Sequence, residues 1–224
     1  MEATPQSRII EATPASTFVA MLAYIMPLSR FASKVDALVV FPGLGEWRRE
    51  SDAIKEWNKE NCTVKHLLIA GQNPNEKNSV IRNLENLQKE PFNLLRIGGV
   101  FSQGDAKNTP EQTKWVARIV AEGKIISLTL CVSPYHMLRA YLTLLKTFIK
   151  RGMNVIIIPS PTPLPPDYIV PETKKKQTDM VPGELKRITE YQEKGDVATM
   201  EELMKYLSWA YSQPLVQADL ACRN

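Results

Sequence analysis

Short apolar segments alternate with amphipathic ones from residue 36 to residue 159, and this alternation constrains the fold more than any other feature of the sequence. Continuous apolar runs of this length are typical of strands that are buried on both faces of a sheet. The predicted strands are residues 36–43, 64–71, 93–99, 125–132 and 154–159. Between them apolar side chains recur at spacings of three and four, which predicts helices at residues 46–60, 80–89, 109–122 and 134–151.

Strands that alternate with helices through right-handed crossovers give a parallel sheet with helices on both faces. We therefore predict an α/β fold, a Rossmann-like three-layer sandwich with a mostly parallel five-stranded sheet and a C-terminal helical extension. Residues 1–34 are expected to form an N-terminal extension with a short helix, and residues 35–163 the α/β domain. Residues 164–224 are expected to form a Pro-rich connector and a helical tail that packs on the same domain, with helices at residues 182–193 and 197–212.

The composition is that of an ordinary globular protein, with 44% hydrophobic and 23% charged residues. A formal net charge of +4, with scattered basic residues, is too small to indicate a nucleic acid partner. Cys62, Cys131 and Cys222 show neither paired nor metal-like spacing, which favours a reducing compartment. The apolar stretch 18–28 is too short to span a bilayer. We expect a cytoplasmic protein with no membrane partner. No clustered ligands indicate a metal site, and metal dependence stays open.

In an open parallel sheet, ligands bind outside the carboxyl ends of the strands. Most of the unusual polar side chains follow the predicted strands at that edge: Arg48, Arg49, Gln72, Asn73, Glu76, Asp105, Asn108, Thr109, His136 and Arg139. The core strands themselves carry almost none of these side chains. This segregation predicts a binding site at the carboxyl edge of the sheet, without identifying its ligand.

The segment CVSPYHMLRA, residues 131–140, places His136 and Arg139 on the first turn of a helix that follows a strand directly. Ser133 suits the N-cap position and Pro134 the first helical position. Unpaired backbone N–H groups and the positive end of the helix dipole favour anions at such a place. Two interpretations of His136 remain level: a surface or capping residue, or a neutral imidazole beside Arg139 in an anion clamp.

The start of the helix at residues 109–122 has a second N-terminal signature. Thr109 as N-cap, Pro110 at the first helical position and Gln112 three residues later predict a capping box. Arg48 and Arg49 begin another helix, where cations are electrostatically disfavoured unless they meet an anion. They either solvate that helix start or bind a ligand.

Well-known catalytic signatures are absent from the sequence. Gly43 and Gly45 resemble the start of a dinucleotide fingerprint, but Arg48 stands where the third glycine belongs. There is no P-loop, no GxSxG, no HExxH and no CxxC motif. A triad of Ser133, His136 and Asp105 has no support from its spacing.

Taken in order, DALVVFPG, LLIAG, NTPEQT and VSPYHMLRA resemble the YdcF/SanA/ElyC-like family, the domain of unknown function 218. The resemblance covers about residues 35–163, and PGELKRI (182–188) is similar to a segment of some longer members. It implies a Rossmann-like fold, a largely unassigned activity, and S-adenosylmethionine or another nucleotide-like compound as ligand. The sequence departs from the family pattern at Gln72, where a second glycine is usual, and at Gln112. These departures leave open whether its ligand is the same as that of better-known members.

The first functional hypothesis is a small-molecule-binding protein, and an enzyme of hydrolysis or group transfer on an anionic or nucleotide-like compound. Its ligand-binding residues are predicted to be Gly43, Gly45, Arg48, Arg49, Gly71, Gln72, Asn108, Thr109, Ser133 and Arg139. His136 is the predicted group for proton transfer, with Glu46 or Asp105 as its partner.

Two alternatives remain. The first is a non-catalytic sensor or adaptor that binds a nucleotide or S-adenosylmethionine, and a homodimer stays open for either function. The second is a partner protein that uses the helical tail as its contact surface, where Met200, Leu203, Leu207 and Tyr211 form an apolar stripe. Core packing explains the same stripe more simply.

Overall fold

A parallel sheet of five strands forms the centre of the computed structural model, which describes residues 13–31, 34–43, 47–71, 84–103, 106–171 and 173–221. Its strands are β1 (Ala37–Val40), β2 (His66–Ala70), β3 (Val100–Gln103), β4 (Ser127–Val132) and β5 (Ile156–Pro161). The strand order is β3-β2-β1-β4-β5, and each neighbouring pair is parallel. The predicted α/β fold with a five-stranded parallel sheet is therefore confirmed.

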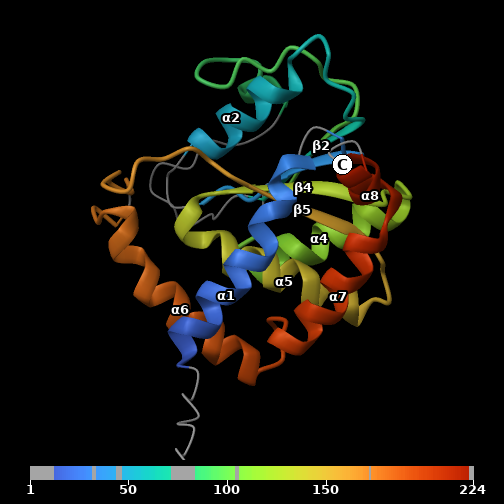
Figure 1. Ribbon diagram of the computed structural model, residues 1–224. Coiled ribbons are helices and arrows are strands. Elements are labelled where there is room, and N and C mark those ends of the chain that lie inside the picture. Colours follow the sequence, from blue (N-terminus) through green and yellow to red (C-terminus); the bar gives the residue numbers. More distant parts are fainter. Residues whose placement is uncertain are drawn as a thin grey trace, which may run out of the picture.

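Helices cover both faces of this sheet. The connections between successive strands contain α2 (Arg48–Trp57), α3 (Leu84–Leu87), α4 (Thr109–Glu122) and, after the short 3₁₀ helix η2 (Pro134–His136), α5 (Met137–Lys150). The crossover from β1 to β2 and the crossover from β3 to β4 run in opposite directions along the sheet. Because both connections are right-handed, α2 and α4 lie on opposite faces. Figure 1 shows α2 above the sheet and α4 and α5 below it.

The N-terminal and C-terminal helices pack together beside α5. The N-terminal segment forms α1 (Pro14–Ile25) and the 3₁₀ helix η1 (Met26–Phe31), and the tail forms α6 (Gln177–Glu193), α7 (Met200–Ser212) and α8 (Pro214–Ala221). In Figure 1 the blue α1 lies between α6 and α7, and it contacts both of them and α5. α6 also packs against η2, which brings the tail to the carboxyl edge of the sheet.

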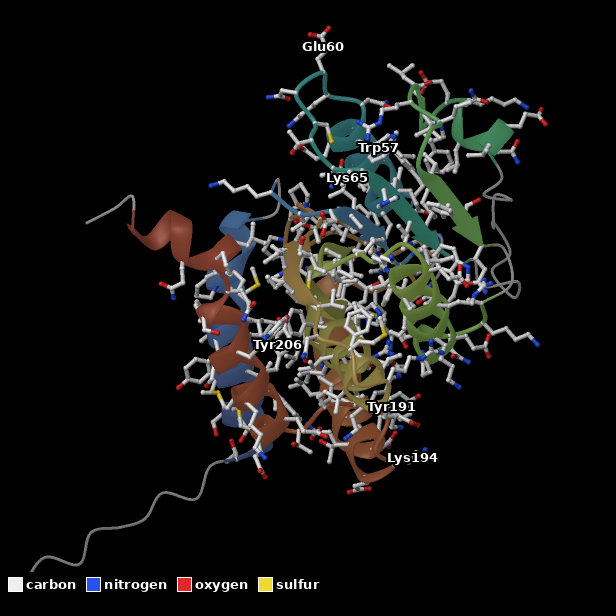
Figure 2. The ribbon with its side chains drawn as sticks, turned by 90° about the vertical axis from the view of Figure 1, so that its right-hand side faces the viewer. Trp57, Glu60, Lys65, Tyr191, Lys194 and Tyr206 are labelled. Carbon is white, nitrogen blue, oxygen red and sulfur yellow. The ribbon has the colours of Figure 1, made fainter. Side chains whose placement is uncertain are left out.

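The apolar stripe of the tail faces the protein core. Leu203 and Leu207 of α7 are buried. Tyr206 of the same helix reaches the edge strand β5, where its hydroxyl accepts a hydrogen bond from the Ile157 N–H at 2.7 Å and donates one to the Val155 carbonyl at 3.2 Å. Figure 2 shows Tyr206 on the side of α7 that faces the sheet. Core packing thus accounts for much of the stripe.

The third strand lies later than the sequence predicted. Residues 93–99 form no strand, and β3 begins at Val100 instead. Leu95 and Ile97 are 76% and 52% exposed, so this apolar run is not part of the buried sheet. Gly99 has a φ of 84°, a left-handed conformation that suits glycine, and its carbonyl accepts the Leu67 N–H at the start of the β2–β3 pairing.

The tail helices also differ from the prediction. α6 begins at Gln177 and continues through Pro182, which was expected to start it. Its start is fixed by the Gln177 side chain, whose amide Nε2 donates to the Leu164 carbonyl at 2.9 Å, and by the Gln177 N–H, which donates to the Tyr168 carbonyl. β5 extends to Pro161 in the Pro-rich segment, and α8 was not predicted.

We expect Tyr206→Phe to lower the free energy of unfolding by about 1–3 kcal/mol, because the buried Ile157 N–H at the sheet edge loses its acceptor. Urea denaturation measures the change. Tyr24→Phe is the matched control, since Tyr24 is 49% exposed. Equal stability of the two variants would show that α7 does not protect the β5 edge through this hydroxyl.

Candidate functional site

A pocket of ≈ 260 Å³ lies at the carboxyl edge of the sheet, where the sequence predicted a site. Six segments line it: the residues after β1, the start of α2, the start of α4, the η2–α5 turn, the connector at Thr173 and one side of α6. Six predicted site residues meet there, namely Gly43, Arg49, Asn108, Thr109, His136 and Arg139. The parallel sheet explains the meeting, because the carboxyl ends of neighbouring strands share one edge.

His136 is held at Nδ1 and has a second, more distant oxygen near Nε2. Its Nδ1 lies 3.0 Å from Glu184 Oε2, and its Nε2 lies 3.4 Å from Thr109 Oγ1. The side chain is buried, with 6% of the residue exposed. His136 is therefore a fixed residue of the pocket, which decides against the interpretation of a surface residue.

Glu184 of α6 is the centre of this arrangement. Besides His136, its carboxylate accepts hydrogen bonds from Arg139 Nε at 2.5 Å, from Arg139 Nη2 at 3.3 Å and from Arg187 Nη1 at 2.8 Å. These hydrogen bonds and the positive charges keep the pKa of Glu184 well below its usual range despite its burial. Glu184 is thus an ionised carboxylate buried in the protein, which requires such partners.

An ionised carboxylate only accepts hydrogen bonds, so the ring proton of a neutral His136 lies on Nδ1 and Nε2 keeps its lone pair. Burial and the positive charge of Arg139 lower the pKa of His136 to about 4, although Glu184 opposes the shift. At neutral pH the imidazole is uncharged. It can accept a proton at Nε2 but has none to donate there.

The N-cap of α4 is Asn108 and not Thr109, which the sequence had predicted. Asn108 Oδ1 accepts the Glu111 N–H at 3.0 Å, and the Glu111 carboxylate accepts the Lys107 N–H at 2.8 Å. Both Asn and Thr are good N-caps, and the acidic residue three positions after Asn108 decides between them. The Thr109 hydroxyl therefore belongs to the pocket, where it accepts a hydrogen bond from Arg139 Nη1 at 3.1 Å.

Arg49 is buried and forms the inner wall of the pocket. Its Nε donates to Ser133 Oγ at 2.7 Å, its Nη1 to the Phe41 carbonyl at 2.9 Å and its Nη2 to the Tyr135 hydroxyl at 3.0 Å. Ser133 stands at the N-cap of η2 and Pro134 follows it, as predicted. The Ser133 hydroxyl, however, accepts from Arg49 and makes no side-chain capping bond.

The remaining predicted residues lie elsewhere. Arg48 is exposed, with its guanidinium carbon 4.8 Å from the centre of the Tyr168 ring, and it does not line the pocket. Gly71 also lies outside the lining and packs against Ala106. The predicted residues Gly45, Glu46, Gln72 and Asp105 fall outside the described part of the chain.

Three charged residues of the site were not predicted: Lys107, Glu184 and Arg187. Glu184 and Arg187 belong to the tail, and the PGELKRI segment was the one signal in the sequence that pointed to them. Within the described lining, the four cations Arg49, Lys107, Arg139 and Arg187 face the single carboxylate of Glu184. The pocket therefore favours an anion.

A larger cavity of ≈ 630 Å³ runs along α2 over β4 and β5. Its lining mixes acidic and basic side chains and includes the thiols of Cys62 and Cys131. Burial raises the pKa of the Cys131 thiol to about 12, which makes that thiol unreactive. Convergent charges and a shifted histidine pKa make the smaller pocket the better candidate site.

A comparison with models of protein families and a comparison with curated proteins found no match. The resemblance to the YdcF/SanA/ElyC-like family therefore remains a prediction. In the described ranges, no three or more His, Cys, Asp or Glu side chains gather as a metal site would require. Within those ranges, too, no helix has the length and apolar character needed to cross a membrane.

The pKa of His136 predicts how stability depends on pH. Between about pH 6.5 and pH 4 the unfolded chain binds a proton at this residue that the folded protein does not bind. The free energy of unfolding should therefore fall as the pH decreases through this window, by up to about 2 kcal/mol from pH 6 to pH 4.5. Urea denaturation of the wild type and of His136→Asn measures this loss, and the variant should lack it. The same slope in both proteins would contradict a buried neutral His136.

Proposed function

We propose that the protein is an enzyme that acts on an anionic, nucleotide-like small molecule by hydrolysis or group transfer in this pocket. The observation that carries the proposal is the Glu184–His136 pair, buried in a pocket lined by four cations. A base oriented by a third group is the arrangement that general acid–base and nucleophilic catalysis require. The motif resemblance supports membership of the YdcF-like family, whose implied ligands are of the same chemical class.

His136 is the proposed general base. Its Nε2 takes a proton from a water molecule or an acceptor hydroxyl, whose oxygen forms the new bond to the substrate. The bond to the leaving group breaks, and the imidazolium returns its proton to that group. Glu184 positions the ring through Nδ1 and stabilises the positive charge that forms on it.

The cations hold the anionic group. Lys107 and Arg187 are exposed enough at the pocket to contact a ligand directly, with the Arg187 side chain 47% exposed. Arg139 is oriented by Glu184 and points one nitrogen at Thr109. Because Glu184 orients Arg139 and Arg187 before the ligand binds, the ligand meets a largely preformed site.

A bound anion also makes His136 a better base. Burial, together with the positive charge of Arg139 and Arg49, lowers the pKa of His136 in the empty pocket. A negative ligand offsets that charge and raises the pKa toward neutrality, where general bases work best. Base strength thus increases when the substrate arrives.

The second candidate is a non-catalytic sensor of a nucleotide or S-adenosylmethionine. It is favoured by the pKa of about 4 for His136, which makes the imidazole a weak base in the absence of a ligand. Sensor and enzyme share the anion site and differ in turnover. One experiment on His136 therefore separates them.

A panel of nucleotides, S-adenosylmethionine, sugar phosphates and pyrophosphate should be tested for binding by thermal shift and for turnover by product detection. We expect His136→Asn to retain binding and to lower kcat/KM by roughly 10²–10⁴-fold, the usual contribution of a general base. His66→Asn is the matched control, because His66 begins β2 and does not line the pocket.

Binding without turnover in the wild type would favour the sensor. Stabilisation by none of these anions would contradict both candidates. Turnover that His136→Asn leaves unchanged would remove the proposed base while leaving an enzyme.

A further inference from the structure

We propose that the anionic group recognised in this pocket must carry a hydrogen-bond donor, so that the pocket selects a phosphate over a sulfate or an ionised carboxylate. This inference rests on the proposed function, since it concerns the same site. It names the class of anion: a phosphate group that keeps one P–OH, as hydrogen phosphate and a singly protonated phosphomonoester do. The specificity-determining atom is His136 Nε2, which is also the proposed base. It accepts the P–OH hydrogen bond when the anion binds, and the reacting water or hydroxyl replaces that group at Nε2 for the proton transfer.

The first step is the tautomer of His136. Glu184 accepts hydrogen bonds from His136 Nδ1, from Arg139 and from Arg187, so every partner of this carboxylate is a donor. The imidazole proton is therefore committed to Nδ1. Nε2 is left as an acceptor on the wall of a pocket whose positively charged lining groups are all donors.

The second step concerns Thr109, the hydroxyl nearest to Nε2. Its Oγ1 lies 3.4 Å from Nε2, beyond the usual range of a good hydrogen bond from a hydroxyl. The same oxygen accepts from Arg139 Nη1 at 3.1 Å, which fixes Thr109 beside the guanidinium. The acceptor capacity of Nε2 is thus poorly used within the protein and suits a donor from a ligand.

Phosphate and sulfate differ in their ability to donate a hydrogen bond to Nε2. Hydrogen phosphate and sulfate are both tetrahedral dianions, and they differ by one proton. Both can accept hydrogen bonds from Lys107, Arg139 and Arg187. The P–OH group of phosphate can also donate to Nε2, whereas each sulfate oxygen would face the lone pair of the ring. Sulfate therefore fits well only when His136 is protonated.

Protonation of His136 in the empty pocket is costly. Charged groups face the ring from three elements: Arg49 of α2, Arg139 of α5 and Glu184 of α6. Burial and the two guanidinium groups outweigh the carboxylate and lower the pKa of His136 to about 4. At pH 7 the charged ring is disfavoured by about 1000-fold, an upper bound on the preference for phosphate. At pH 5 that factor falls to about tenfold.

Isothermal titration calorimetry of the full chain with inorganic phosphate and with inorganic sulfate, at matched ionic strength, tests the inference. We expect phosphate to bind at least roughly tenfold more tightly at neutral pH. The ratio should shrink toward pH 5 more steeply than in His136→Asn, because phosphate also becomes a monoanion over this range and that change is common to both proteins. His136→Asn should lose the preference, because the asparagine amide can donate as well as accept. Lys107→Gln should weaken both ions and keep their ratio.

Equal binding of the two ions by the wild type across this pH range would overturn the selection of phosphate and leave the anion site standing. A preference for phosphate that His136→Asn retains would overturn the role of Nε2. Failure of both ions to bind would overturn the anion site, and with it the proposed function. Because the wild-type ratio at neutral pH needs no substitution, this part of the test does not depend on the folding of a variant.

Discussion

One buried carboxylate, that of Glu184, holds the candidate site together. It accepts hydrogen bonds from His136, Arg139 and Arg187, and each of these three side chains also lines the pocket. Removal of this carboxylate would leave a guanidinium buried without its counter-charge, which is strongly unfavourable. Because Glu184 lies on α6, the C-terminal tail is part of the site and not an appendage to the α/β domain.

The sheet supplies the other half of the arrangement. β1 and β4 are neighbours, so the start of α2 and the η2–α5 turn lie together at their carboxyl ends. Arg49 joins these two segments through Ser133 and Tyr135, which fixes the inner wall of the pocket before any ligand is present. Figure 2 shows Trp57 at the end of α2, and Glu60 after it, well away from Tyr191 of α6 and from Lys194, which follows that helix.

Local patterns in the sequence were enough to predict the sheet and much of the pocket. Apolar runs indicate the strands, and parallel topology places the carboxyl ends of the strands at one edge. The sequence was therefore enough to predict that His136, Arg139 and Thr109 share a site. The strand predicted at residues 93–99 was wrong, because apolar composition does not show that Leu95 and Ile97 face solvent. The N-cap of α4 was predicted one residue too late, at Thr109 instead of Asn108, because both residue types suit that position.

Glu184 was beyond the reach of such reasoning. A glutamate on an amphipathic helix is most often solvated, and which side of α6 meets η2 is decided by tertiary packing more than forty residues away in sequence. Four of the predicted residues, Gly45, Glu46, Gln72 and Asp105, lie outside the described residues, so their roles stay predictions.

The central claim is that Glu184 fixes His136 as a neutral ring with its proton on Nδ1. Long-range ¹H–¹⁵N correlation NMR of the imidazole nitrogens tests it most directly, and the two histidines of the chain are told apart with His66→Asn. At neutral pH we predict a protonated Nδ1 and an unprotonated Nε2 for His136. A proton on Nε2, in the other neutral tautomer or in a charged imidazolium, would contradict the account.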